Sequence, residues 1–137
     1  MTRILGIDFG ERRVGLAVSD PLKIIAQPFI TLIRDAGDGW WNQLEAVISE
    51  QEIELAVVGY PLTMSGEQGR QTKVVDKFIA DLEQNLALPV ERYDERLTTV
   101  AARKALQQQG IKTGHNKEMV DRTAAAMFLQ NYLDSHP

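Results

Sequence analysis

Hydrophobic residues at the start of the chain follow the pattern of two short strands joined by a tight turn. Residues 4–9 and 13–18 are mostly apolar, and a polar, glycine-containing segment separates them. This pattern is typical of a β-hairpin. A third run, Ala26–Leu32, predicts another strand, in which Pro28 is best tolerated at a sheet edge or at the strand start. Short connections between the three runs predict an antiparallel meander.

The remainder of the chain alternates helical and strand patterns. We predict helices over about 40–51, 71–86, 98–110 and 117–133, most of them from apolar residues that recur at steps of three and four. Strands are predicted over 55–59, an apolar run suited to a strand covered on both faces, and over 90–93. Residues 1–137 are therefore expected to form a single α/β layered domain with a mixed sheet.

Composition fits a globular protein and excludes several site chemistries. Of 137 residues, 44% are hydrophobic and 25% charged, and none is cysteine, which excludes disulfides, thiolate metal sites and cysteine nucleophiles. With two histidines, a histidine-rich zinc site is not expected. No apolar run approaches the ~20 residues of a membrane span, and the N-terminus lacks a signal-peptide pattern. A cytoplasmic location is predicted.

Asp8 is the first candidate for chemistry, because it lies within an apolar strand. Strand side chains alternate between faces, so Asp8 shares its face with Gly6 and Gly10, which leave open space beside the carboxylate. An unpaired buried charge is costly, and a metal ion, a basic partner or water must offset it. The alternative is a turn aspartate that accepts hydrogen bonds from the backbone of Gly10 and Glu11.

Two further carboxylates are expected near Asp8. Ligands gather at the carboxyl ends of strands in an open α/β sheet, and Glu95 lies just past the last predicted strand, with Asp94 pointing to the other face. Asp121 is in line with Ala125 on the apolar stripe of the last helix, so its side chain should face the sheet. The alternative for Asp121 is an acid in the first helical turn, favoured there by the helix dipole.

The three acids together indicate a metal site. Three like charges converge only when cations offset them, and all-oxygen ligands favour Mg²⁺ or Mn²⁺. Two such ions, roughly 3.5–4 Å apart, would suit in-line attack of water on a phosphodiester.

Four motifs, in the same order, resemble the YqgF/RuvX family over nearly the whole chain. They are Gly6–Gly10 with Arg13–Asp20, Val58–Leu62 with Met64 and Gly66, Asp94–Thr99, and Val120-Asp121 with Ala124-Ala125. The resemblance implies a three-layer, ribonuclease-H-like α/β fold, related to Holliday-junction resolvases of the RuvC type. Its mixed sheet would have five strands, three antiparallel and then parallel ones, between flanking helices.

The resemblance also implies an activity and a set of site residues. The activity is that of a metal-dependent nuclease linked to maturation of the 5′ end of the 16S ribosomal RNA precursor. By position, the catalytic and metal-binding acids would be Asp8, Glu95 and Asp121; whether Asp94 or Glu95 is the ligand stays open. At three positions where family members often have Leu, Asn and Asp, the chain has Tyr60, Thr63 and Ser65.

The charge distribution bears on substrate binding. A net charge of −4 and a pI of about 5.2 count against a strongly basic nucleic-acid binder, but basic residues outnumber acidic ones from Arg96 onward. A local basic face can bind phosphates on an acidic protein, and a solvated helix surface explains the same residues. The candidates for holding the substrate backbone are Arg12, Arg13, Arg70, Arg96 and Lys117. Arg96 has an alternative role as an ion-pair partner of Asp94.

Three functions compete. The first is a metal-dependent endonuclease that acts on structured RNA or on branched DNA, the latter favouring a homodimer because resolvases cut both strands as dimers. The second is a non-catalytic nucleic-acid-binding factor in ribosome assembly. The third, an actin-like ATPase module, is disfavoured because such ATPases close two domains around the nucleotide and because no Walker-type motif is present.

Overall fold

A computed structural model of the chain describes residues 2–34, 37, 39–61, 69–95 and 98–137; of Arg70 it describes the backbone only. Five strands form one sheet in the order β3-β2-β1-β4-β5. The strands are β1 (Arg3–Phe9), β2 (Arg13–Ser19), β3 (Ala26–Ile33), β4 (Ile53–Tyr60) and β5 (Val90–Asp94). The first three pair antiparallel, and β4 and β5 run parallel to β1. The predicted meander and mixed sheet are confirmed.

Pro28 lies where the sequence predicts, on an outer strand of the sheet. The pairing of β3 with β2 shifts there, because Leu16 pairs with Ile30 whereas the next residue, Ala17, pairs with Pro28. One residue of β3, Phe29, is thus left over as a bulge, a feature typical of edge strands that contain proline.

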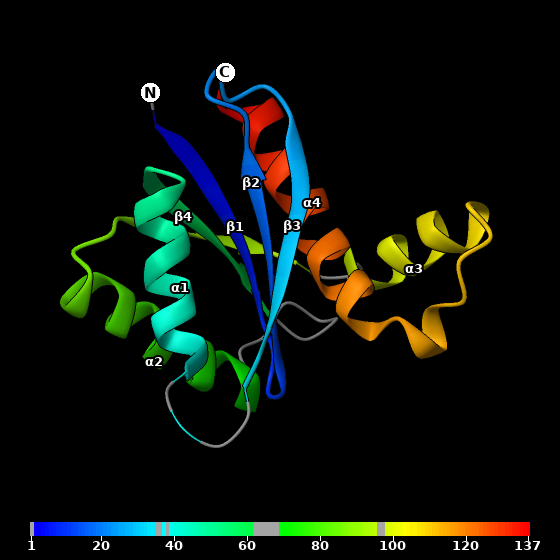
Figure 1. The fold of residues 1–137 in the computed structure, drawn as a ribbon, viewed down its shortest axis with the longest axis horizontal. Coiled ribbons are helices and arrows are strands. Elements are labelled where there is room, and N and C mark those ends of the chain that lie inside the picture. The colour runs from blue at the N-terminus through cyan, green and yellow to red at the C-terminus, as the bar shows by residue number, and fades with distance from the viewer. Residues whose placement is uncertain (1, 35–36, 38, 62–68, 96–97) are drawn as a thin grey trace.

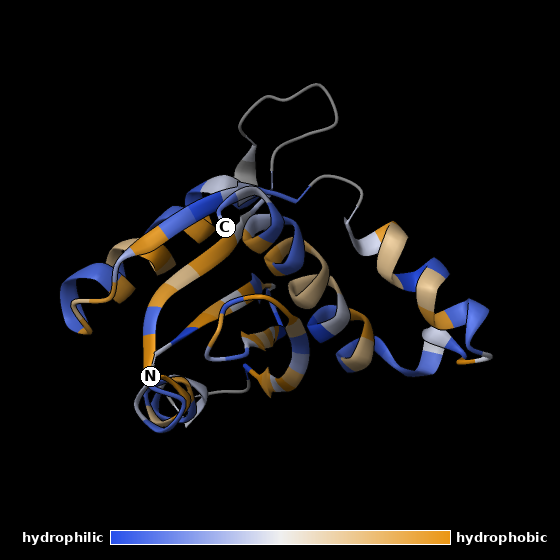
Figure 2. Ribbon diagram, turned by 90° about the horizontal axis from the view of Figure 1, so that it is seen from above, coloured by the Kyte–Doolittle hydropathy of each residue, from blue (hydrophilic) through white to orange (hydrophobic). Residues whose placement is uncertain are grey.

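Helices cover both faces of the sheet (Figure 1). Their bounds are α1 (Gly39–Glu50), α2 (Arg70–Asn85), α3 (Thr98–Gln108) and α4 (Lys117–Ser135), with a short 3-10 helix η1 (Thr113–His115) before α4. Helices α1 and α2 pack on one face and α4 packs on the other, while α3 packs on α4 (Figures 1 and 2). Within the described ranges, no helix has the length and apolar character that crossing a bilayer requires.

Alternation of side chains divides the sheet into two apolar faces. Leu5 and Ile7 of β1 belong to the core under α1 and α2, whereas Ile4 packs with residues of α4. The apolar pattern over 71–86 predicts that Val74 and Val75 both belong to the buried stripe of this helix. Val75 is buried, but Val74 is 46% exposed, because the buried stripe of α2 is narrower than the apolar pattern.

The α4 face of the sheet is lined with small residues, and the helix therefore lies very close to it. A Cβ atom added at Gly6 would lie 2.9 Å from the Leu129 Cβ and 3.0 Å from the Ala125 carbonyl oxygen. The stripe predicted on the last helix is buried here, including Ala125 and Phe128. Asp121 lies one turn before Ala125, and its backbone lies against Gly15 of β2, so the helix brings this acid to the sheet.

Candidate active site

Asp8 lies on the α4 face, near the carboxyl end of β1. It is directly opposite Gly15 of β2 and shares its face with Gly6. The alternative of a turn aspartate is not supported at Gly10, whose N–H donates to the Arg13 carbonyl oxygen at 2.9 Å. The Asp8 side chain is partly buried on the α4 face of the sheet.

Glu95 follows directly after β5 and points to the same face. Its backbone N–H donates to the Tyr60 carbonyl oxygen at 3.4 Å. A Cβ atom at Gly59 would collide with the Glu95 carboxyl group, so the glycine makes the space that this side chain occupies. Asp94 is the exposed last residue of β5. Of the two neighbouring acids, Glu95 is therefore the one that approaches Asp8.

The carboxyl groups of Asp8 and Glu95 share a hydrogen bond. Burial, followed by the negative charges of Glu95 and Asp121, raises the pKa of Asp8 well above its usual range. Burial also raises the pKa of Glu95, although the hydrogen bond from Asp8 acts in the opposite direction. Two carboxylates this close repel each other, so protonation of one carboxyl group would stabilise the pair.

Asp121 approaches the pair from α4, but it has a cationic partner of its own. The Arg13 Nε donates to the Asp121 Oδ2 at 2.6 Å, and the two side chains are 29% and 21% exposed. Burial raises the pKa of Asp121, and the ion pair with Arg13 opposes the increase. A Cβ atom at Gly15 would collide with the Asp121 backbone, so this glycine allows the acid to come so near.

The structure thus brings two of the three predicted acids into contact and the third within electrostatic reach of both. Among the residues described, no three acidic or histidine side chains are arranged as a ready-made metal site. The donor chemistry still suits a hard divalent cation, because all available ligand atoms are carboxylate oxygens. Arg13 already supplies one positive charge beside Asp121.

Basic side chains next to Asp121 line two adjoining cavities. The first, here called the Asp121 cavity, has a volume of about 430 Å³ and is lined by Arg13, Thr99, Arg103, Gln107, Thr113, Gly114, Lys117, Val120 and Asp121. The second, here called the basic cavity, has about 580 Å³ and is lined by Arg12, Arg13, Ile33, Arg34, Gly114, His115, Lys117 and Glu118. Three of the five predicted substrate-binding residues therefore lie together beside the acids.

The other predicted residues of the site are only partly described. Arg96, Thr63, Ser65 and the side chain of Arg70 lie outside the described part of the chain. Tyr60 is buried, and its hydroxyl donates to the Asp76 Oδ2 of α2 at 3.0 Å. This tyrosine therefore faces α2, on the side of the sheet away from α4.

Sequence reasoning missed the residues that make the site compact. Gly15 and Gly59 read as ordinary strand residues, and their role depends on the approach of α4 and of Glu95. Arg34, which follows β3, is also absent from the predicted site, because it belongs to no motif. A glycine within an otherwise apolar strand is the signal that could have marked Gly15 and Gly59.

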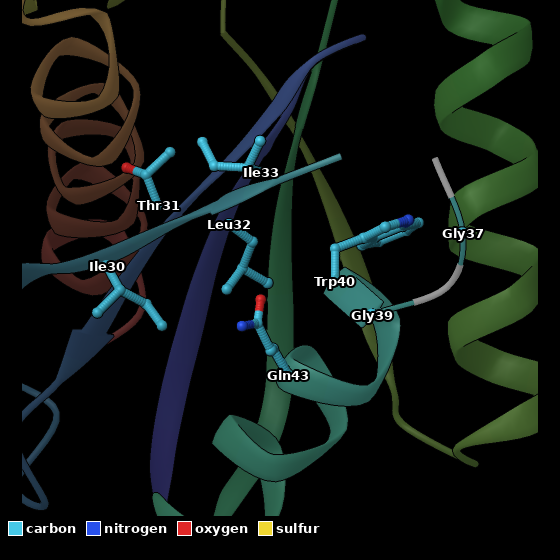
Figure 3. A pocket seen from close by; sticks show the side chains of 8 residues that line it. All are labelled: Ile30, Thr31, Leu32, Ile33, Gly37, Gly39, Trp40 and Gln43. Atoms are coloured by element: carbon cyan, nitrogen blue, oxygen red, sulfur yellow. The ribbon is translucent and has the colours of Figure 1, made fainter. Parts of the chain in front are cut away.

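A different hollow lies between β3 and the start of α1 (Figure 3). Its volume is about 530 Å³, and Ile30, Leu32, Trp40 and Gln43 are among its lining residues. The described residues that line it include no charged side chain, in contrast to the two cavities beside Asp121. Phosphate chemistry is therefore expected on the α4 face and not here.

Known proteins are similar to this chain over nearly its full length. The model of the RuvX family, described as Holliday junction resolvase, matches residues 2–135. A protein of Desulforamulus reducens is 42% identical and covers 97% of this chain and 97% of its own. A protein of Chloroflexus aggregans is also 42% identical, over 96% of this chain and 93% of its own. Both are named "Putative pre-16S rRNA nuclease".

Solved structures show the same fold at much lower identity. Fowlpox virus resolvase, in a complex with substrate Holliday junction DNA, has a TM-score of 0.63 at 11% identity and covers 98% of each chain. RuvC of T. thermophilus, in a complex with a Holliday junction substrate, has a TM-score of 0.54 at 18% identity, over 98% of this chain and 95% of its own. The predicted ribonuclease-H-like fold is confirmed.

Proposed function

Because this chain belongs to the RuvX family, we propose that it is a metal-dependent nuclease that hydrolyses phosphodiester bonds. The proposed substrate is the 16S ribosomal RNA precursor, a choice that the names of the curated relatives support. The proposed role is maturation of its 5′ end in the cytoplasm. The observation that carries the proposal is the close approach of the three acids on the α4 face: Asp8 lies opposite Gly15, which contacts the Asp121 backbone, and the Glu95 carboxyl group fills the space above Gly59. Acids held together against their mutual repulsion are typical of functional sites.

Asp8, Glu95 and Asp121 are the proposed ligands of Mg²⁺ or Mn²⁺, and two ions fit the reaction. When bound, such ions activate the attacking water and stabilise the leaving oxygen of an in-line displacement. Asp8 must give up its proton to act as a ligand, and Asp121 must exchange Arg13 for the cation. Gly15 and Gly59 keep the three carboxylates within reach of one another, since any side chain there would displace Asp121 or Glu95.

Basic residues are proposed to hold the substrate backbone. Arg13, once released from Asp121, lies beside Lys117 and can meet a phosphate next to the acids. The full proposed set is Arg12, Arg13, Arg70, Arg96 and Lys117. Contacts of this kind position a nucleic acid without reading its sequence, and their binding weakens as salt increases.

A second candidate function is cleavage of branched DNA. It is favoured by the description of the family and by the resolvase fold. Such a resolvase would need a homodimer, so that two sites meet two strands. A third candidate is a ribosome-assembly factor that binds RNA without cutting it. This function would use the residues of the basic cavities and would not need the three acids.

A titration with Mg²⁺ and with Mn²⁺ tests these functions on the wild type and on Asp8→Asn. The substrates are an RNA that spans the 5′ end of 16S ribosomal RNA and its leader, and a four-way DNA junction. We expect RNA cleavage that depends on the metal and falls at least 100-fold in Asp8→Asn, while Asp81→Asn, on α2, cleaves like the wild type. Unchanged cleavage by Asp8→Asn contradicts the assignment. Faster cutting of the junction favours the resolvase, and tight RNA binding without cleavage favours the assembly factor.

A further inference from the structure

We infer that the basic cavity is a phosphate subsite, which holds the nucleic-acid backbone next to the point of cleavage. Arg12, Arg34 and Lys117, together with the first turn of α4, are its ligands. This inference rests on the proposed function for the identity of the ligand, and it concerns binding alone. Arg34 is not among the substrate-binding residues predicted from the sequence, because it belongs to none of the family motifs.

The charge of the cavity is strongly one-sided for a protein with a net charge of −4. Arginine and lysine make up four of its lining residues, and Glu118 is the one acid among those described. Arg13 is engaged by Asp121, whereas Arg12 and Lys117 are exposed and form no ion pair with any described residue. Their charges are available to a ligand.

Arg34 is held in place before any ligand arrives. Its guanidinium lies over the ring of Phe9, 4.4 Å from the centroid, and 5.2 Å from that of Trp40. The Nη1 donates to the Gly10 carbonyl oxygen at 2.6 Å, while the buried Nε has no hydrogen-bond partner in the described structure. These contacts fix the guanidinium at the wall of the basic cavity, so an anion that binds there does not have to order the side chain first.

The amino end of α4 adds donors to the same cavity. Helix α4 starts at Lys117, and the preceding Asn116 does not cap it, because the Asn116 Nδ2 donates to the Lys112 carbonyl oxygen at 2.5 Å. The first N–H groups of an uncapped helix are unpaired, and the helix dipole favours an anion beside them. Gly114, Lys117 and Glu118 of this segment line the cavity.

The position of the cavity identifies its ligand as a strand and not as a free phosphate ion. The basic cavity and the Asp121 cavity share Arg13, Gly114 and Lys117. A polymer that passes Asp121 therefore continues past Arg13 into the basic cavity. A nucleic-acid backbone can place one phosphate beside the acids and another beside Arg34, and so occupies both cavities. A single phosphate ion occupies only one.

Binding in EDTA tests this subsite without cleavage. The probe is a fluorescein-labelled RNA hairpin from the 5′ end of the 16S precursor, measured by anisotropy at several salt concentrations. We expect Arg12→Gln and Lys117→Gln each to weaken binding about tenfold, and each to reduce the slope of log K against log[salt] by about 0.7 to 0.9, the value for one phosphate contact. Arg34→Lys, which keeps the charge but loses the fork of donors, should weaken binding severalfold.

Lys77→Gln is the matched control, because Lys77 is an exposed base on α2, on the other face of the sheet. Wild-type affinity and slope in both Arg12→Gln and Lys117→Gln overturn the subsite, even if the protein cleaves RNA. Equal binding of inorganic phosphate or of a mononucleotide overturns the assignment to a strand. An absence of cleavage by the wild type in Mg²⁺ refutes the nuclease, but a loss of binding in these variants still supports the subsite.

Discussion

At the scale of single residues, each proposed metal ligand has a partner within the protein. The carboxyl groups of Asp8 and Glu95 lie together, and Asp121 is paired with Arg13. Under the proposed assignment, a cation would compete with a proton for the first pair and with Arg13 for Asp121. Two predictions follow from these partners.

Asp8→Asn should stabilise the metal-free protein at pH 8. The pKa of Asp8 is raised in the folded state by burial and by its neighbours. Its contribution to stability is fully present below the unfolded-state pKa and is lost as pH rises through the folded-state value. Asparagine keeps the shape without the charge, so the free energy of unfolding, measured in urea with EDTA, should fall less between pH 5 and pH 8 than in the wild type. If burial and the neighbouring acids do not raise the pKa of Asp8, the free energy of unfolding will depend on pH in the same way in both proteins, which would contradict the prediction.

Arg13→Gln should tighten binding of Mg²⁺ in the absence of nucleic acid. The substitution removes the cation that competes for Asp121, and a partly exposed pair of this kind is worth up to ~1 kcal/mol, or about fivefold in the dissociation constant. Isothermal titration calorimetry measures the effect. Arg13→Lys, which keeps the charge, is the control and should bind Mg²⁺ like the wild type. Weaker binding by Arg13→Gln would mean that Arg13 supports the site and does not compete for it.

At the scale of elements, the site depends on how closely α4 lies on β1 and β2. Gly15→Ala should destabilise the fold by about 1–3 kcal/mol, because its Cβ would collide with the Asp121 backbone and displace the helix. Chemical denaturation measures this loss. Gly39→Ala, at the start of α1, meets open space and should be neutral or stabilising by up to ~1 kcal/mol. Equal stability of the two variants would show that α4 can move away from the sheet without cost.

The order of the strands and α-helices could be predicted, mostly from the pattern of apolar residues, and the faces of Asp8, Glu95 and Asp121 followed from alternation and helical spacing. The 3-10 helix η1 was not predicted, because a single polar turn has no apolar periodicity. The exposure of Val74 could not be predicted, since the apolar pattern alone does not give the width of the buried stripe. The pair of Arg13 and Asp121 joins residues 108 positions apart and exists only once α4 has packed. The space at Gly59 likewise depends on where the chain turns after β5.

At the scale of the whole molecule, metal binding should be linked to folding. A ligand that binds only the folded state stabilises it by about 2.7 kcal/mol at one hundred times its dissociation constant. Carboxylates must lose their protons to bind a cation, and the raised pKa values of Asp8 and Glu95 make protons strong competitors. The increase in Tm on adding Mg²⁺ should therefore be larger at pH 8 than at pH 5.5. Asp8→Asn should show little increase at either pH, and a wild-type increase that is independent of pH would contradict the ligand assignment.

The site draws Asp8 from the first strand and Asp121 from the last helix, and α4 is also what covers one apolar face of the sheet. On a translating ribosome, residues 117–135 emerge from the exit tunnel only after all five strands. A nascent chain therefore has its sheet, with Asp8 and Glu95, before it has Asp121. The three acids can come together only after α4 has left the tunnel and packed on the sheet.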